Sequence, residues 1–350
     1  MTIISKDIVH LLPGPVEIDL AVKQEFSRLP ESHRGDEFKL EFKNLKTKLC
    51  RVVNSRFVEV LSGSGTLAND AIAAQLSQHP EQGLILSNGE FGERITSQAS
   101  RFDLNFHSIT APWGEPFDYK EIADFIDRNQ EIKWIWAVHC ETSTGVLTDW
   151  MRLSKICLLR NIKLCLDCIS SIGAVPVNLE NVYLASCSSG KAICSFPGLS
   201  MVFYNHEIEV LSSIPKYLDL GFFRRENGMP FTISSNLVLA LIKAVDLLDE
   251  NEEKIYSGIV KKSVVMREAL QPFNLKIIND SDLSSPSVVT IELPDSINSV
   301  AFGKLMEQRN CFINYNSGYL IKRNWVQTFI TRNTSMETIL RFADLVRKNL

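Results

Sequence analysis

Short runs of apolar residues alternate with amphipathic segments over the first two hundred residues. The apolar runs are β-rich and predict strands at 57–61, 83–86, 105–109, 133–138, 163–166, 182–185 and 199–204. Helical patterns between them predict helices at 66–78, 94–102, 119–129 and 149–160. Several strands are nearly continuous apolar stretches, such as IWAV and MVFY, which is typical of strands with helices on both faces. The alternation therefore predicts an α/β fold with a mostly parallel sheet.

The pattern changes after Tyr204. A basic, glycine-containing stretch, LGFFRRENGMP, precedes a long helical region at 237–270. A second α/β set follows, with strands predicted at 288–293, 312–315 and 326–330, a helix at 300–309 and a last helix that begins at a capping box, 334–337. We therefore expect a large domain (1–250, with an N-terminal arm) and a smaller α/β C-terminal domain (251–350), joined by the long helix.

Composition and charge argue against some classes of function. Of the 350 residues, 22% are charged and 45% hydrophobic, and the net charge is −4. A net negative chain weighs against nucleic-acid binding, which normally shows a basic excess. The sequence has no run of roughly 20 apolar residues, as a membrane-spanning helix needs. It also lacks a basic stretch leading into an apolar run at its start, so we expect a cytoplasmic protein that does not bind membranes.

The eight cysteines are expected to be thiols in that compartment. Cys165 and Cys168 form a C-x-x-C, but a second pair at matching spacing, which a zinc site would need, is missing. The run around them, IKLCLDCISSIG, reads as a strand that enters a loop. This favours two buried apolar residues over a zinc or redox site, and we expect no metal.

A glycine-rich loop lies between the first strand and the first helix of the predicted sheet, with the sequence SGSGTLAN. Small residues let the backbone approach an anion, which the N–H groups at the helix start then hold. Ser64 and Thr66 add hydroxyl donors. Gly63, Gly65 and Ala68 also match a dinucleotide fingerprint, but the next strand ends in LSNG without the carboxylate that binds a ribose. The loop therefore favours a phosphate cradle over a dinucleotide site or a simple tight turn.

Two further segments suggest a cofactor. Asp167 ends the apolar strand at 163–166, where α/β sheets place ligand groups, and Lys191 follows the next strand in the small, hydroxyl-rich loop SSGKA. A phosphate cradle, a strand-end aspartate and a loop lysine are the set that pyridoxal 5′-phosphate (PLP) requires. The lysine forms the Schiff base and the aspartate pairs with the pyridine nitrogen. Each residue alone has an ordinary structural reading, and their co-occurrence in this order favours PLP.

With these residues, the sequence resembles the class V aminotransferases of the PLP fold-type I group, close to the alanine–glyoxylate and serine–pyruvate aminotransferases. The resemblance covers most of residues 11–245, and the C-terminal hundred residues match only loosely. The matching segments are LLPGPV, SHRGDEF, SGSGTLANDA, NGEFGER, HCETSTGVL, LDCISSIGA, SCSSGKAICSFPGLS and MPFTISSNLVLAL.

The resemblance implies a role for each matching residue. Lys191 is the Schiff-base lysine and moves the α-proton, and Asp167 binds the pyridine nitrogen. Ser64, Gly65 and Thr66 would bind the phosphate, together with Thr232 of the neighbouring subunit. The ring would contact Phe91 on one face, Ile169 on the other and Thr142 near its hydroxyl. Gly14 would line the substrate entrance. The resemblance thus also implies a homodimer with shared active sites.

The sequence departs from the family in two places. The residue before the lysine is commonly Gln, and here it is Gly190, which predicts either weaker phosphate binding or compensation by Ser189. The family also tends to have a carboxylate-binding Arg inside a late strand, where this chain has Gln327. Arg323 and Arg332, which flank that strand, are candidates to bind the substrate carboxylate. Arg34 is another candidate, and its segment SHRGDEF also resembles phosphoserine aminotransferases.

The leading interpretation is a PLP-dependent aminotransferase that moves an amino group from a small L-amino acid, of the alanine or serine type, to a small 2-oxo acid, of the glyoxylate or pyruvate type. Another class V activity is an alternative: a phosphoserine or aminoethylphosphonate aminotransferase, or a lyase or desulfurase. A nicotinamide-dependent oxidoreductase and an inactive homologue that acts as an interaction protein are alternatives of another kind.

Overall fold

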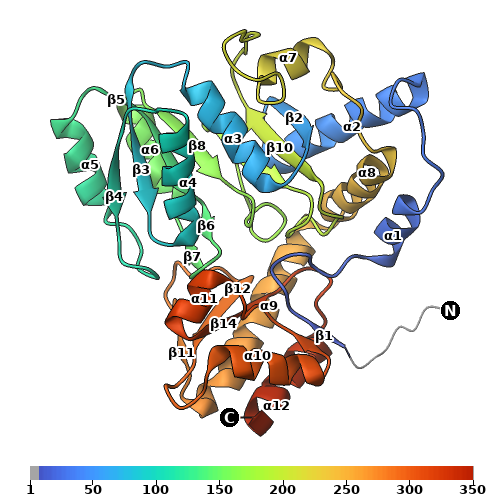
Figure 1. The fold of residues 1–350 in the computed structure, drawn as a ribbon, viewed down its shortest axis with the longest axis vertical. Coiled ribbons are helices and arrows are strands. Elements are labelled where there is room, and N and C mark those ends of the chain that lie inside the picture. The colour runs from blue at the N-terminus through green and yellow to red at the C-terminus, as the bar shows by residue number, and fades with distance from the viewer. Residues whose placement is uncertain (1–7, 350) are drawn as a thin grey trace.

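The computed structural model describes residues 8–349 and has a seven-stranded sheet at its centre (Figure 1). Its strand order is β2-β10-β9-β8-β5-β3-β4, and β10 runs antiparallel to both neighbours while the remaining pairs are parallel. The mostly parallel sheet is therefore confirmed. The strands are β2 (Phe57–Ser62), β3 (Gln82–Ser87), β4 (Phe106–Thr110), β5 (Ile132–Val138), β8 (Lys163–Asp167), β9 (Leu184–Ser188) and β10 (Leu199–Tyr204).

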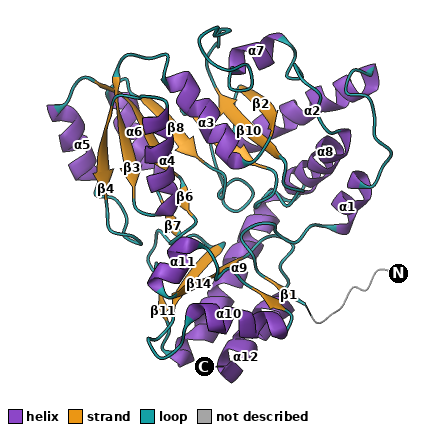
Figure 2. Ribbon diagram, viewed as in Figure 1, coloured by secondary structure: helices purple, strands orange, loops and turns teal. Residues whose placement is uncertain are grey.

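Helices cover both faces of this sheet, because the strands have apolar side chains on both faces (Figure 2). Leu164 and Leu166 of β8 pack into one core, with helices α2, α5, α6 and α8, and Cys165 between them packs into the other, with α3, α4 and α7. The helices are α1 (Leu20–Phe26), α2 (Asp36–Val53), α3 (Gly65–Leu76), α4 (Glu90–Arg101), α5 (Tyr119–Arg128), α6 (Trp150–Leu159), α7 (Leu220–Arg225) and α8 (Ser235–Asp249).

The C-terminal part has its own hydrophobic core around a three-stranded antiparallel sheet, β11-β12-β14. Val9 and Leu11, from the start of the chain, lie in this core, because β1 (Val9–His10) pairs with β13 (Cys311–Phe312). A small hairpin, β6 (Cys140–Glu141) and β7 (Val146–Leu147), follows β5. The remaining elements are α9 (Glu252–Leu270), a 3₁₀ turn (Gln271–Phe273), β11 (Lys276–Ile277), β12 (Val288–Glu292), α10 (Ser299–Gln308), α11 (Gly318–Arg323), β14 (Trp325–Phe329) and α12 (Met336–Asn349).

The helical region expected at 237–270 consists of two helices in the structure. α8 ends at Asp249 and α9 begins at Glu252, after Asn251, whose φ of −135° and ψ of 22° are not helical. The polar run Asp-Glu-Asn has no apolar residue to continue the buried stripe, and Asn readily leaves helical geometry. The division into domains at residue 250 stays a prediction.

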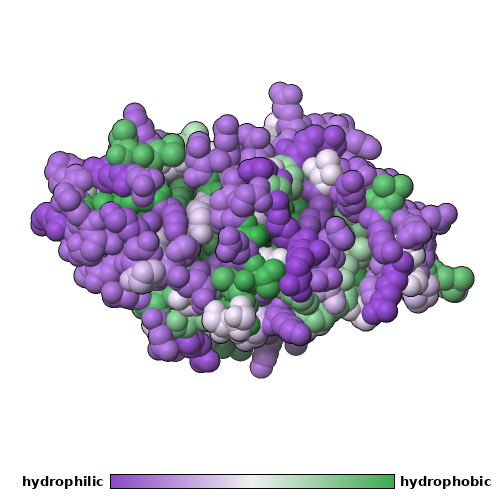
Figure 3. Space-filling view, turned by 90° about the horizontal axis from the view of Figure 1, so that it is seen from above, coloured by the Kyte–Doolittle hydropathy of each residue, from purple (hydrophilic) through white to green (hydrophobic). Residues whose placement is uncertain are grey.

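Seen from above, the surface is largely hydrophilic and its hydrophobic residues form small separate groups (Figure 3). Single exposed apolar side chains are normal for a globular protein. Among residues 8–349, no helix combines the length and the apolar character needed to cross a bilayer.

Candidate active site

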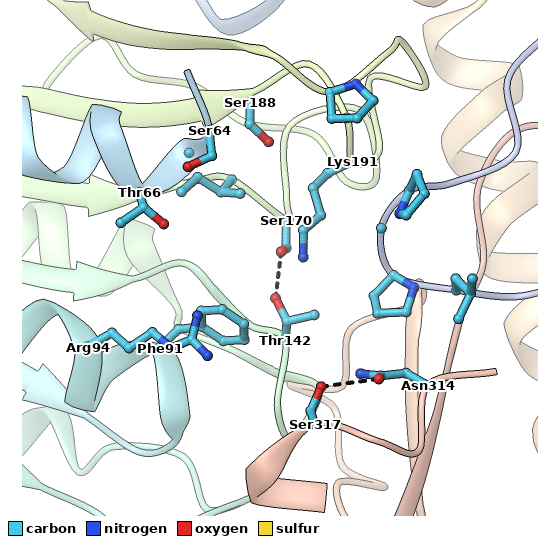
Figure 4. A pocket seen from close by; sticks show the side chains of 18 of the residues that line it. Ser64, Thr66, Phe91, Arg94, Thr142, Ser170, Ser188, Lys191, Asn314 and Ser317 are labelled. Carbon is cyan, nitrogen blue, oxygen red and sulfur yellow. Dashed lines mark hydrogen bonds between the residues drawn. The ribbon is translucent and has the colours of Figure 1, made fainter. Parts of the chain in front are cut away.

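A cavity of about 860 Å³ lies where the sheet, the N-terminal arm and the C-terminal part of the chain meet (Figure 4). Its volume is in the range of small-molecule sites. The large-domain wall includes the start of α3, the first turns of α4, the end of β8 and the loop after β9. The arm contributes Leu12 to Pro15, and the C-terminal part contributes Glu307, residues 313–317 and Tyr319.

Asp167 is the last residue of β8 and is only 4% exposed. Its Oδ2 accepts a hydrogen bond from Asn69 Nδ2 of α3 at 2.8 Å, and its Oδ1 accepts one from the backbone N–H of Ile169 at 2.9 Å. Burial raises the pKa of this carboxyl, while the two hydrogen bonds and the charge of Lys191 oppose the rise. The carboxylate is thus held in one orientation at the cavity wall.

Lys191 follows β9 and points into the cavity (Figure 4). Its Nζ lies 5.6 Å from the centre of the Phe91 ring, and within residues 8–349 no hydrogen bond or ion pair involves it. Burial lowers the pKa of this amine, and the nearby Asp167 charge partly offsets that shift. A lysine with a lowered pKa has more of the neutral, nucleophilic amine at neutral pH.

The start of α3 forms an open cradle beside this pair. Ser64 and Thr66 are exposed, and neither side-chain hydroxyl makes a hydrogen bond within residues 8–349. Gly65 lies between them, and a Cβ on Gly65 would come within 2.5 Å of Ile169 Cδ1. The glycine is therefore required by close packing, and the free hydroxyls and N–H groups suit an anion.

Phe91 lies in the first turn of α4 and lines the cavity. Glu141, which is distant in sequence, caps this helix. Glu141 Oε2 accepts hydrogen bonds from the backbone N–H groups of Phe91 at 3.1 Å and Gly92 at 3.0 Å. Its Oε1 accepts from the N–H of Ser143 at 3.0 Å and from the Ser143 hydroxyl at 2.5 Å. Glu141 is 1% exposed, so this buried carboxylate fixes where the helix and its phenyl ring lie.

Thr142 is buried, and its hydroxyl lies 2.5 Å from that of Ser170 (Figure 4). Both residues line the cavity, as does Ile169. On the opposite side, Gly14 lies against Lys191, because a Cβ there would be 3.7 Å from Lys191 Cε. Thr142, Ile169 and Gly14 therefore lie together around Lys191, as the sequence predicts, and Ser170 joins them.

The structure turns Ser189 away from the cavity, which corrects its expected role. Ser189 is fully buried, and its hydroxyl donates to the carbonyls of Phe196 at 2.6 Å and Leu199 at 3.0 Å. Ser188 lines the cavity instead, because successive residues of a strand point to opposite sides. Gly190 has a packing cause, since a Cβ there would lie 2.8 Å from Pro197 Cβ and 2.9 Å from Pro197 Cα.

The arginines expected to bind substrate also lie elsewhere in the single chain. Arg323 places its guanidinium 3.4 Å from the centre of the Trp113 ring, outside the cavity. Arg34 lines a second, basic cavity of about 740 Å³ beside α2 and β2. Arg332 has a buried guanidinium with no hydrogen-bond partner within residues 8–349, and it does not line the active-site cavity either.

Gln327, in the strand position where the family tends to have an arginine, is fully buried and does not line the cavity. Its Nε2 donates to the carbonyl of Thr142 at 2.5 Å and to the hydroxyl of Thr290 at 2.7 Å. Its Oε1 accepts from the hydroxyl of Tyr319 at 3.3 Å. The amide is thus a neutral link between the two halves of the chain.

Sequence reasoning missed several residues that line the cavity. Asn69, one helical turn after the cradle, and Ser170, three residues after Asp167, could have been found from their spacing to the motifs. Arg94 ends the segment NGEFGER and faces the cavity one turn after Phe91. The polar residues 314–317 of the C-terminal part carried no motif and could not have been found.

The cavity fits PLP. An anion cradle, a buried carboxylate and an amine line one space, next to an aromatic ring, and within residues 8–349 neither the cradle hydroxyls nor the amine makes a hydrogen bond. These are the groups that bind a phosphate, a protonated pyridine nitrogen and an aldehyde, respectively.

Comparison with known proteins gives a consistent result. A family model described as Aminotransferase class-V matches residues 25–226. The 42 kDa subunit of the soluble hydrogenase of Anabaena cylindrica is 30% identical over 301 residues, which cover 82% of this chain and 79% of that protein. A 2-aminoethylphosphonate–pyruvate transaminase of Phocaeicola vulgatus is 25% identical over 67% of this chain and 68% of its own length.

Solved structures show the fold. The alanine–glyoxylate aminotransferase of a Nostoc species has a TM-score of 0.88 at 23% identity and covers 99% of this chain and 96% of its own. The pyridoxamine–pyruvate aminotransferase of Mesorhizobium loti has a TM-score of 0.90 at 19% identity, with 100% and 95% covered. The prediction of the fold-type I architecture is therefore confirmed.

Proposed function

Because the chain belongs to the class V aminotransferases, we propose that it moves an amino group from a small L-amino acid, of the alanine or serine type, to a small 2-oxo acid, of the glyoxylate or pyruvate type. The family implies PLP as the cofactor. The observation that carries the proposal is the Lys191 amine, which lies in one cavity with the Asp167 carboxylate and has no hydrogen bond or ion pair within residues 8–349.

Different residues of the cavity would bind different parts of the cofactor. Ser64, Gly65, Thr66 and Ser188 would hold the phosphate, and Asp167 would hold the pyridine nitrogen in its protonated form. The cofactor, when bound, supplies an electron sink for the bond broken at the substrate α-carbon. Phe91 and Ile169 would hold the ring between them, and the Thr142–Ser170 hydroxyl pair would bind its polar edge.

Lys191 would bind the cofactor covalently and then, once released, move the proton at the substrate Cα. Its lowered pKa suits this role, because a base works best when its pKa lies near the operating pH. The arm at Gly14 lies against the lysine stem and would help to exclude water there.

A second donor class has a specific observation in its favour. The relative from Phocaeicola vulgatus is a 2-aminoethylphosphonate–pyruvate transaminase, and relatives from Lysinibacillus sphaericus and Pseudomonas fluorescens have the same name. We therefore include an amino phosphonate donor, with pyruvate as acceptor, as the second candidate.

The test uses purified protein loaded with PLP. Borohydride reduction followed by peptide mapping should place the pyridoxyl label on Lys191. Amino transfer from L-alanine, L-serine and 2-aminoethylphosphonate to glyoxylate and pyruvate should be measurable for at least one pair. Lys191→Ala should abolish nearly all turnover, whereas Lys120→Ala, an exposed lysine of α5, should leave it unchanged. A label on another lysine, or no transfer with any pair, contradicts the proposal.

A further inference from the structure

We propose that Arg94 binds the acid group of the substrate, a carboxylate or a phosphonate, in place of the arginine that this chain lacks at position 327. This inference rests on the proposed function and specifies how the same site recognises its substrate.

Arg94 lies on α4 one turn after Phe91, and both side chains face the cavity (Figure 4). Its guanidinium carbon is 4.9 Å from the centre of the Phe91 ring, and Lys191 Nζ is 5.6 Å from the same centre. The reactive amine and a permanent positive charge therefore both lie near the same aromatic ring. We infer that a substrate whose amino group reaches Lys191 extends its acid group toward Arg94.

The guanidinium is free to bind an oxyanion. Its Nε pairs with Glu90 Oε1 at 3.0 Å, and within residues 8–349 its two terminal nitrogens make no hydrogen bond. The side chain is 54% exposed and lines the cavity. Two parallel N–H groups of an arginine match the two oxygens of a carboxylate or phosphonate.

The arginines on either side of the strand that contains Gln327 do not take this place. Position 327 carries a neutral amide whose hydrogens already bond to Thr142 and Thr290. Arg323 stacks on Trp113, and neither it nor Arg332 lines the cavity. Among residues 8–349, Arg94 is the one arginine in the cavity wall.

The opposite wall supports a substrate of this kind. Asn314 and Ser317 face the cavity from the C-terminal part, and the Ser317 hydroxyl donates to Asn314 Oδ1 at 3.2 Å (Figure 4). These neutral groups can bond to an acid without adding charge. Within residues 8–349, the arginine charge in this cavity therefore comes from α4.

The experiment measures binding of unreactive acids to the PLP-loaded protein by calorimetry. Propanoate represents a carboxylate and ethylphosphonate a phosphonate. We expect Arg94→Gln to raise the dissociation constant of at least one acid about 10-fold or more, because a charge-assisted pair is lost. The acid that depends more on Arg94 identifies the substrate class. Arg101→Gln removes the same charge from the last turn of the same helix and should change neither constant.

Three results would overturn the inference: wild-type protein that binds neither acid, Arg94→Gln that binds both within twofold of wild type, or Arg332→Gln that loses binding while Arg94→Gln does not. If Arg94→Gln fails to load with PLP, Arg94→Lys replaces it, and we then expect at least threefold weaker binding because the paired N–H groups are lost. If Arg94→Gln weakens acid binding but the wild-type protein transfers no amino group, the proposed function is contradicted and the role of Arg94 in binding an acid is supported.

Discussion

Burial acts in opposite directions on the two ionisable groups that face the cavity. It raises the pKa of Asp167 and lowers the pKa of Lys191, so both are driven toward their neutral forms. The charge of each opposes the shift of the other. A bound pyridinium would add a positive charge beside Asp167 and favour the ionised carboxylate, which is the state needed to keep the ring nitrogen protonated.

Asp167→Asn should therefore lower kcat by roughly 10²-fold or more, about 3 kcal/mol of transition-state stabilisation, while the shape of the site is kept. PLP binding should survive, as measured by the absorption spectrum. Asp149→Asn, at the start of α6 and away from the cavity, is the matched control and should leave kcat unchanged. An Asp167→Asn enzyme within a few-fold of wild type contradicts this role of the carboxylate.

His139 gives a prediction for the dependence of stability on pH. It is 3% exposed, its Nδ1 lies 2.9 Å from the Ser171 hydroxyl, and burial lowers its pKa to about 4 from an ordinary 6.5. Between pH 6.5 and about 4, the unfolded chain therefore binds a proton at His139 that the folded chain does not bind. The free energy of unfolding should fall as the pH drops from 6.5 toward 4, on the order of 1.4 kcal/mol per pH unit for this group.

Urea unfolding at several pH values checks this. His139→Asn should be less stable at neutral pH, because the core loses packing, but its stability should depend on pH less steeply than that of wild type between pH 6.5 and about 4. Equal slopes in the two proteins would show that His139 does not set this dependence.

At the scale of single elements, α4 depends on a cap from outside its own sequence. Glu141 accepts the N–H groups of Phe91 and Gly92, so the helix begins at Glu90. Glu141→Gln replaces one acceptor oxygen by an NH₂ group and leaves a buried donor without a partner. We expect the free energy of unfolding to fall by about 2 kcal/mol and the affinity for PLP to drop, because Phe91 is held less firmly.

Chemical denaturation and PLP titration test this expectation. Glu121→Gln, in the first turn of α5 on the surface, removes the same charge from another helix start and should change neither quantity appreciably. If Glu141→Gln keeps wild-type stability, the distant cap does not hold α4.

The elements that sequence could predict are those with local causes. The strand predicted at 199–204 matches β10, and the one at 163–166 matches β8 to within one residue, because continuous apolar runs mark buried strands. The helix predicted at 94–102 begins four residues earlier, since its cap comes from Glu141. The pairing of β1 with β13 joins segments three hundred residues apart and has no local signal.

The same distinction applies to the site. The cradle, Asp167 and Lys191 could be predicted to meet because carboxyl ends of parallel strands share one edge of the sheet. Whether Ser188 or Ser189 faces the cavity depends on the phase of a strand, which a loop-like sequence does not reveal. Arg323 could not be placed, because its stacking on Trp113 depends on how the C-terminal part packs against the large sheet.

At the scale of the whole molecule, Thr232 and Arg34 are among the residues of predicted active-site function that lie outside the cavity of their own chain. Thr232 is exposed before α8 and does not line the cavity, and Arg34 lines the second, basic cavity instead. A homodimer in which each chain completes the site of its partner would give both a role. We therefore propose that Thr232 reaches the phosphate in the partner subunit, so that PLP stabilises the dimer by mass action.

Mixing two inactive or weakened variants tests this arrangement. In a mixed dimer of Lys191→Ala and Thr232→Ala chains, one site takes Lys191 from the Thr232→Ala chain and Thr232 from the Lys191→Ala chain, so it is intact. The other site carries both lesions. If the sites are shared, the PLP affinity of the intact site should return to the wild-type value once subunits exchange. If it stays at the value of Thr232→Ala alone, or if the protein is a monomer with full PLP occupancy, each chain binds its cofactor alone and Thr232 merely precedes α8.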